Sequence, residues 1–236
     1  MRVSCTIVAE VLALLKEKAV AGVTTLELEE IALKETKKRK GTPAFKGYAG
    51  FPFALCCSPN DRVIHGMPNA VPLVDGDIVS VDFGVLYDDF YGDAAITIPV
   101  GVVSSEAAKL LEVTEQSLYK GIDKAVAGGR LFDISSAVQS YVELHGYSVV
   151  RDFVGHGIGK KLHEEPQVPN YGVAGRGVQL KPGMVLAIEP MVNRGVFAVK
   201  VLDDGWTTVT ADGSLSAHFE HTVAITNNGP DILTRL

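Results

Sequence analysis

The sequence has few of the features that mark a secreted or membrane protein. It contains three cysteines, Cys5, Cys56 and Cys57, which are too few for a disulfide framework, and the adjacent pair cannot readily bridge to each other. The N-terminal apolar run Val11–Leu15 ends at Lys16 and is too short for a signal segment or a membrane span. These absences predict a cytoplasmic protein that has no membrane partner and folds in a reducing compartment.

The chain also lacks an excess of positive charge. Its 22 Lys and Arg residues against 28 Asp and Glu residues give a net charge of −6, so we expect no specific nucleic-acid partner. A basic cluster comprises Lys34, Lys37, Lys38, Arg39 and Lys40. It falls at the end of an expected helix, where cations complement the helix dipole, and this is the preferred interpretation. A transient contact with the ribosome is the alternative.

No linker rich in Pro, Gly and Ser divides the 236 residues, and 47% hydrophobic residues suffice for a sizeable core. We therefore expect a single catalytic domain over residues 1–236. Helices are expected over residues 3–18 and 24–40, from 104 to about 127, and from 133 or 135 to 146. Strands follow each helix pair, near residues 54–57, 79–85, 92–98, 148–154, 185–189, 198–203, 206–210 and 215–225. This repeated plan predicts an α+β fold with two pseudo-symmetric halves that share one sheet.

Asp82 and Asp93 lie on the two strands of an expected hairpin. Val79–Val85 alternates like a half-buried strand, Gly92–Ile98 is its return partner, and Tyr87–Asp89 supplies the turn. A reversal centred between the first two turn residues places the two aspartates directly opposite each other. Like charges in that position destabilise a sheet, so a divalent metal ion between them is the simplest explanation. A hairpin with both acids facing solvent is the alternative.

Three more residues of ligand type lie inside or at the end of apolar runs. His156 has glycines on both sides, which predicts that the backbone approaches a bound group closely, although a core histidine is the alternative. Glu189 follows Val-Leu-Ala-Ile, and Glu220 lies mid-strand among apolar residues. Desolvating an unpaired carboxylate costs several kcal/mol. The four carboxylates and one imidazole carry a formal charge of about −4, which two divalent cations would balance; oxygen-rich ligation without sulfur suits Mn, Fe, Co or Zn.

These residues belong to motifs that occur together in a known family. In order, the motifs are His65-Gly66-Met67-Pro68, Gly155-His156-Gly157-Ile158-Gly159, His163-Glu164-Glu165-Pro166, Ile188-Glu189-Pro190-Met191 and Phe219-Glu220-His221-Thr222. With Asp82 and Asp93, the set closely resembles the type I methionine aminopeptidases over nearly the whole chain. The resemblance implies a pita-bread fold, in which a mainly antiparallel central sheet carries helices on its outside and the metals lie between the two halves.

The resemblance also implies a role for individual residues. The implied ligands of two divalent metal ions are Asp82, Asp93, His156, Glu189 and Glu220. Asp93 and Glu220 would bridge both ions, Asp82 would chelate one, and the other two would complete the second ion. The implied substrate-binding residues are His65, His163, Tyr48, Phe51, Cys56, Leu162 and Trp206, with Phe45 nearby. His218 and His221 are not needed as ligands.

The implied reaction is hydrolytic removal of the N-terminal methionine from newly made polypeptides, by a hydroxide that bridges the two metals. Glu189 would take the proton of the water and relay it to the leaving amine. His163 would donate to the carbonyl oxygen, and His65 would bond to the leaving-group side. We expect a monomer whose partner is the N-terminal Met of a nascent chain. Proline-directed cleavage, as in the prolidases, and a binding module with a degenerate site are the alternatives.

Overall fold

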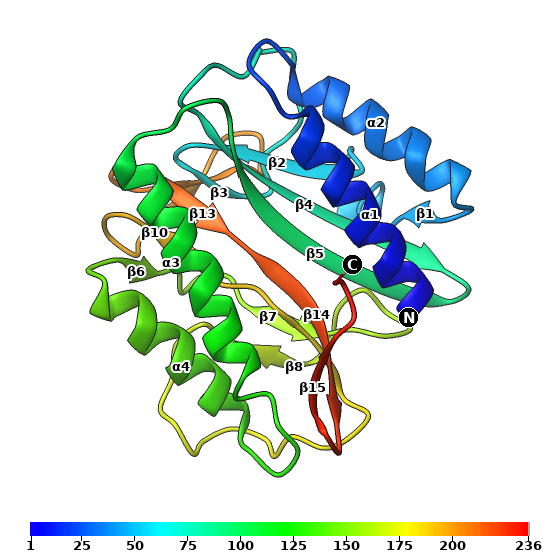
Figure 1. The fold of residues 1–236 in the computed structure, drawn as a ribbon, viewed down its shortest axis with the longest axis vertical. Coiled ribbons are helices and arrows are strands. Elements are labelled where there is room, and N and C mark those ends of the chain that lie inside the picture. The colour runs from blue at the N-terminus through cyan, green and yellow to red at the C-terminus, as the bar shows by residue number, and fades with distance from the viewer. Residues whose placement is uncertain (236) are drawn as a thin grey trace.

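The computed structural model describes residues 1–235, in which helices cover the outside of a curved central sheet (Figure 1). The helices are α1 (Arg2–Lys18), α2 (Thr25–Lys38), α3 (Ser105–Ile122), α4 (Leu131–Leu144) and the short 3-10 helix η1 (Tyr48–Gly50). The strands are β1 (Thr42–Pro43), β2 (Leu55–Pro59), β3 (Arg62–Ile64), β4 (Ile78–Tyr87), β5 (Phe90–Pro99), β6 (Ser148–Val149), β7 (Gly155–Gly157), β8 (Glu164–Val168), β9 (Val185–Ile188), β10 (Met191–Asn193), β11 (Val199–Val201), β12 (Thr208–Thr210), β13 (Ser216–His218), β14 (Glu220–Thr226) and β15 (Gly229–Ile232).

The central sheet runs in the order β1-β4-β5-β14-β9-β7-β8, with β2 also paired to β4 and β15 to β14. All of these neighbours are antiparallel. Two small sheets, β13-β10-β6 and β11-β12-β3, complete the strands. Within residues 1–235, no helix combines the length and the apolar character that crossing a bilayer requires.

Each half of the sheet carries its own helix pair and its own apolar core. Helices α1 and α2 pack over β2, β4 and β5, where Leu15, Leu28 and Phe83 are fully buried. Helices α3 and α4 pack over β9 and β14 around Leu118 and Ile134 (Figure 1). The central β5–β14 pair joins the two halves. The described chain therefore has the two-part plan that the repeated helix and strand pattern predicts.

The helix ends agree with the sequence prediction where a capping motif defines them and differ elsewhere. Thr24 and Glu27 form the predicted capping box of α2: Glu27 N–H donates to Thr24 Oγ1 at 3.2 Å, and Thr24 N–H donates to Glu27 Oε2 at 2.7 Å. Helix α4 begins at Leu131, earlier than predicted, because the Asp133 carboxylate accepts from Arg130 N–H at 2.8 Å. Asp133 therefore lies inside the first turn rather than at the start of the helix.

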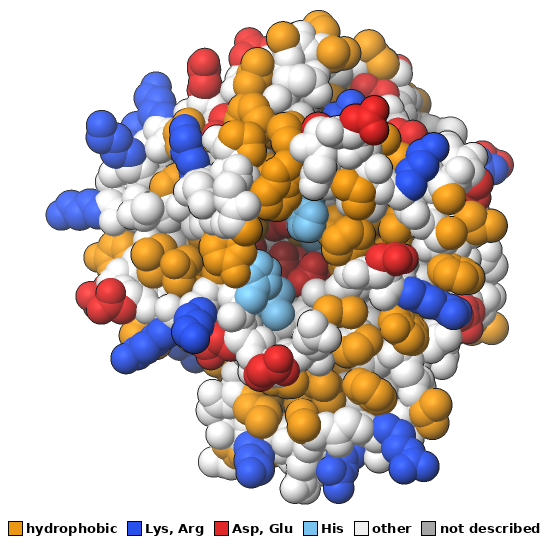
Figure 2. All heavy atoms as spheres, turned by 180° about the vertical axis from the view of Figure 1, so that it is seen from behind, with side chains coloured by type: hydrophobic (Ala, Val, Ile, Leu, Met, Phe, Trp, Pro, Cys, Tyr) orange, Lys and Arg blue, Asp and Glu red, His pale blue; other side chains and the backbone are white. Residues whose placement is uncertain are grey.

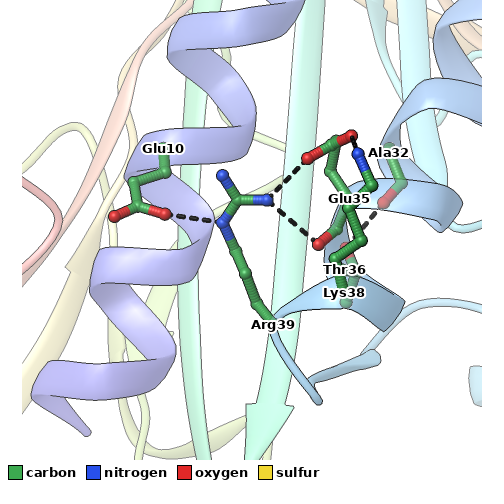
Figure 3. Close-up of polar contacts among 6 residues, drawn as sticks. All are labelled: Glu10, Ala32, Glu35, Thr36, Lys38 and Arg39. Atoms are coloured by element: carbon green, nitrogen blue, oxygen red, sulfur yellow. Dashed lines mark hydrogen bonds and ion pairs between the residues drawn. The ribbon is translucent and has the colours of Figure 1, made fainter.

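Arg39 joins the two N-terminal helices (Figure 3). Its guanidinium donates to Glu10 of α1 at 2.6 Å and to Glu35 of α2 at 2.8 Å. Lys38 pairs with Glu35 as well. Two cations of the basic cluster are therefore paired within the fold, whereas Lys34, Lys37 and Lys40 are exposed.

The hairpin of β4 and β5 forms as expected, but its register differs from the prediction. Asp82 pairs with Ala95 and Asp93 with Gly84, so the two aspartates are diagonal rather than opposite neighbours. The loop consists of Asp88 and Asp89, whose φ angles of 48° and 63° are the positive values that a type I′ turn requires. The predicted direct pair is wrong because the turn is centred one residue later. A register shift of two residues keeps both carboxylates on one face of the sheet.

The last predicted strand is divided in the structure. Residues 216–218 form β13, which pairs with β10, and residues 220–226 form β14, which pairs with β5 and β9. The chain changes sheets at Phe219. Phe219 thus separates His218, the last residue of β13, from Glu220, the first residue of β14. The predicted strand over residues 148–154 is shorter than expected, since only Ser148–Val149 forms β6.

A buried carboxylate fixes the start of β2, the strand that carries Cys56. Glu29 on α2 accepts the backbone N–H groups of Ala54 and Leu55, both at 2.8 Å. Strand β2 then pairs with β4 so that Cys56 lies opposite Asp82. A helix residue of the first half thereby determines where one wall residue of the site lies.

Candidate metal centre and substrate pocket

A cavity of about 240 Å³ lies between the two halves of the sheet. On the face opposite to that of Figure 1, Figure 2 shows a hollow with acidic side chains at its floor, histidines beside them and hydrophobic side chains around its rim. The acids and the imidazole at the floor are Asp82, Asp93, His156, Glu189 and Glu220. Strands β4, β5, β7 and β14, with the residue that follows β9, therefore bring all five predicted ligand residues to one cavity.

Three of these residues are close enough to hold one ion together. Ligand atoms of Asp93, His156 and Glu220 all lie within 4.8 Å of one another. Each of these residues is at most 7% exposed. Asp82 and Glu189 line the same cavity next to this three-residue cluster.

The carboxylates at the floor of the cavity have unsatisfied oxygens and raised pKa values. Among residues 1–235, one oxygen each of Asp82, Asp93 and Glu220 is buried without a hydrogen-bond partner. Burial raises the pKa of Asp82 to about 7 and the pKa of Glu189 to about 8. Burial, and then repulsion from the neighbouring carboxylates, hold the pKa values of Asp93 and Glu220 well above the usual range. A divalent ion supplies the missing partner and the missing charge, so these residues fit a metal site.

His156 presents the form of imidazole that binds metals. Its Nδ1 lies 2.8 Å from the carbonyl oxygen of Gly157, which can only accept, so Nδ1 carries the proton and Nε2 is a free lone pair. Burial lowers the pKa of His156 to about 4, which keeps the ring neutral. Its Nε2 lies 3.7 Å from Glu189 Oε1.

The glycines around His156 have a different role from the predicted one. A Cβ on Gly155 would lie 2.3 Å from the carbonyl oxygen of Ala187, and one on Gly157 would lie 2.3 Å from that of Glu165. The neighbouring strands β8 and β9 occupy this space, so the glycines allow close strand packing. The prediction that they admit a bound group was wrong.

The two predicted substrate-side histidines flank the cavity. His163 Nδ1 lies 2.8 Å from the hydroxyl of Tyr48, and its ring centre lies 4.2 Å from that of His156. His65 follows β3 with a φ of 56°, a left-handed conformation that is uncommon outside glycine. Its ring packs edge-on against Phe153 at 5.5 Å. Burial lowers the pKa of both histidines, that of His65 to about 4.

The walls of the cavity are mainly apolar. All of the predicted wall residues line it, namely Tyr48, Phe51, Cys56, Leu162, Trp206 and the nearby Phe45. Trp206 packs edge-on against Phe51 at 5.1 Å and is therefore part of the cavity wall rather than of a core alone. Sequence reasoning missed Ala49, Ile64, Phe153 and Val154, which line the cavity as well. The position of Phe153 just before the His156 motif is the one local indication of its role.

The comparisons with known proteins identify the family. Residues 1–227 match the sequence model of metallopeptidase family M24. The chain belongs to this family. It is 59% identical over 234 residues to a methionine aminopeptidase of Clostridium perfringens, covering 99% of this chain and 94% of that protein. It is 54% identical over 222 residues to methionine aminopeptidase 1 of Bacillus subtilis, covering 94% and 90%.

Solved structures agree with the family assignment. A methionine aminopeptidase from Thermotoga maritima superposes with a TM-score of 0.99 at 48% identity, covering 100% of this chain and 95% of that chain. A prolidase from Pyrococcus furiosus gives a TM-score of 0.80 at 23% identity and covers 100% and 63%, which shows a shared fold alone. The predicted resemblance to the methionine aminopeptidases and the predicted pita-bread fold are confirmed. This M24 protein is a metallo-exopeptidase that uses divalent metal.

Proposed function

We propose that this M24 enzyme removes the N-terminal methionine of newly made polypeptides and that it holds two divalent metal ions. The proposed ligands are Asp82, Asp93, His156, Glu189 and Glu220. The observation that carries the proposal is the convergence of these side chains, from both halves of the fold, on the floor of one cavity. The names of relatives that are 59% and 54% identical over nearly the whole chain support methionine as the substrate residue.

The charge of the floor supports two ions rather than one. Four carboxylates face the cavity, and burial raises the pKa of each of them. One divalent ion would balance only half of that charge. Mn, Fe, Co and Zn are the proposed metals, because the ligand set contains oxygen and nitrogen but no sulfur.

Bound divalent ions supply a hydroxide nucleophile at neutral pH. Glu189 accepts the proton that the attacking water loses and passes it to the leaving amine. His163 Nδ1 lies 2.8 Å from the Tyr48 hydroxyl. With this hydroxyl as the donor, the His163 proton resides on Nε2. His163 then donates this proton as a hydrogen bond to the substrate carbonyl oxygen while negative charge develops there. His65 bonds to the leaving-group side of the substrate.

The apolar walls of the cavity determine which N-terminal side chain of the substrate is preferred. An unbranched thioether fits an apolar cavity lined by Phe51, Cys56 and Trp206, and it needs no hydrogen-bond partner. A lysine ammonium would lose its hydration in the same space without gaining a counter-ion on the walls. The cavity is therefore expected to select methionine over charged residues.

We also propose the partner, the oligomeric state and the compartment of the enzyme. The N-terminal methionine of a nascent chain is the proposed partner, the enzyme acts as a monomer in the cytoplasm, and the exposed lysines of α2 make a transient contact with the ribosome. Co-sedimentation with ribosomes of the wild type and of Lys34→Glu/Lys37→Glu tests that contact. Equal binding by both proteins contradicts it.

Peptide hydrolysis tests the proposed reaction. The metal-loaded enzyme is expected to release methionine from Met-Ala-Ser and to cleave Leu-Ala-Ser far more slowly. Lys-Ala-Ser and a peptide with proline in the second position, Ala-Pro-Ser, serve as the charged and the prolidase-type substrates. Equal turnover of the lysine peptide contradicts the apolar pocket, and preferred turnover of Ala-Pro-Ser contradicts methionine removal.

A further inference from the structure

His218 is a buried histidine that the proposed reaction does not use. It ends β13, and it is 1% exposed. Among the described residues, neither of its ring nitrogens has a hydrogen-bond partner. Buried polar groups without a partner are rare, and each one needs an explanation.

Hydrogen bonds hold the backbone of His218, and its burial leaves the ring little room to turn to another partner. Thr97 on β5 accepts from His218 N–H at 2.9 Å and donates to the His218 carbonyl at 2.8 Å. Strand β13 also pairs with β10, where His218 lies opposite Met191. The ring is therefore presented at a fixed place beside the floor of the cavity.

The acceptor in front of this ring is Glu189. His218 Nε2 lies 3.6 Å from Glu189 Oε2, and the other carboxylate oxygen, Oε1, lies 3.7 Å from His156 Nε2. Glu189 is thus placed between two imidazoles, with one oxygen toward each. The Glu189 backbone carbonyl is fixed separately, by the side-chain amide of Asn170 at 3.0 Å.

We propose that His218 is a positioning residue for Glu189: a small approach of the two side chains from 3.6 Å lets Nε2–H donate to Oε2, and this bond directs the other oxygen, Oε1, toward His156. The bond satisfies the unpartnered nitrogen and sets the rotation of the carboxylate about its last side-chain torsion. Partners of this kind typically change metal affinity by about 10–100-fold. This inference rests on the proposed two-metal function and adds to it the residue that orients one ligand.

Two substitutions separate a donor from a space-filling role. His218→Gln keeps an N–H group at the position of Nε2, whereas His218→Leu keeps bulk but has no donor. His221→Leu is the matched control, because His221 is also a histidine of this strand region but its Nδ1 lies 2.9 Å from Thr234 Oγ1. The measurements are isothermal titration of the metal-free proteins with Mn²⁺, thermal unfolding without metal, and the steady-state hydrolysis of Met-Ala-Ser.

His218→Leu is expected to bind one of its two ions about 10–100-fold more weakly and to lose kcat, while His218→Gln recovers most of both. His221→Leu is expected to unfold at a lower temperature and to keep the wild-type metal affinity. Equal metal affinity of wild type and His218→Leu overturns the role of His218, as does a His221→Leu protein that loses metal affinity to the same extent. A wild type that binds fewer than two ions contradicts the proposed function instead.

Discussion

Glu189 and His163 line the same cavity but have different surroundings. Glu189 lies between two imidazoles with its side chain 13% exposed, and desolvation raises its pKa to about 8, so its carboxylate needs a cation to stay ionised. His163 contacts Tyr48 through Nδ1, which leaves Nε2 for the substrate. In the proposed reaction, Glu189 therefore serves both metal binding and proton transfer, and His163 serves the substrate oxygen alone.

Substitution of these two residues is expected to separate metal loading from chemistry. Glu189→Gln damages both together, since the amide is a poor ligand and cannot accept the proton of the water. His163→Ala keeps both metals and lowers kcat by about 10²–10³, with a smaller change in KM. Metal analysis and steady-state kinetics on the two variants provide the test. A His163→Ala protein without one metal would show that His163 is a ligand and that the five-residue set is wrong.

Tyr48→Phe tests how His163 is oriented. The variant keeps the ring that lines the cavity but removes the hydroxyl that holds Nδ1, so both imidazole tautomers become available. We expect kcat to fall by less than in His163→Ala, while metal content and KM change little. Kinetics equal to the wild type would mean that the Tyr48 hydroxyl has no part in setting the His163 proton.

At the scale of elements, the β4–β5 hairpin carries two of the proposed ligands, and its turn decides their offset. Both loop residues have a positive φ, which Asp and Asn tolerate and which β-branched residues adopt only with strain. The conformation of the turn is therefore a local property that substitution can test without touching the cavity.

Asp89→Val is expected to lower the free energy of unfolding by about 1–2 kcal/mol, because valine must adopt a φ near 63°. Asp89→Gly, the matched variant, should not lose this stability, since glycine adopts positive φ at no steric cost. Urea unfolding of both metal-loaded variants measures the difference. Equal stability of the two variants would contradict the type I′ turn.

The sequence is sufficient to predict that Asp82, Glu189 and Glu220 come to one cavity, because they are acids in or next to apolar runs. It does not determine how those strands meet. An error of one residue in the centre of the turn moves the partner of Asp82 by two residues. The division of the last strand at Phe219 depends on pairing with strands far away in the chain, and so does the contact of His218 with Glu189. Long-range pairing of this kind leaves no local pattern in the sequence.

At the scale of the whole molecule, the proposed metals connect two halves that otherwise have separate helix pairs and cores. Asp82 and Asp93 belong to the first half, and His156, Glu189 and Glu220 belong to the second. Without metal, the buried carboxylates repel one another across this junction. Metal binding is therefore expected to stabilise the folded state as well as to enable the reaction.

The stability of the metal-free protein is expected to fall as the pH rises from about 6.5 to about 8; below this range the lowered pKa values of His65 and His156, about 4 in the folded state, act in the opposite direction. The folded-state pKa values of Asp82 and Glu189, about 7 and about 8, lie above their ordinary values of 3.8 and 4.5. The folded state therefore binds more protons than the unfolded state in this range, and stability decreases with pH. Thermal unfolding at pH 5 and pH 8, with and without Mn²⁺, should show a larger metal-induced increase in Tm at pH 8. An increase that is larger at pH 5 contradicts the buried carboxylate cluster.

Metal content and methionine release, measured on the same protein, test the central claim most directly. The protein is stripped with a chelator, its residual metal is determined, and Mn²⁺, Fe²⁺, Co²⁺ or Zn²⁺ is returned stepwise while Met-Ala-Ser hydrolysis is followed. We predict that hydrolysis falls to background without metal, returns on reloading, and accompanies a final content of two ions per chain. Full hydrolysis of Met-Ala-Ser by protein with no detectable metal would contradict the account.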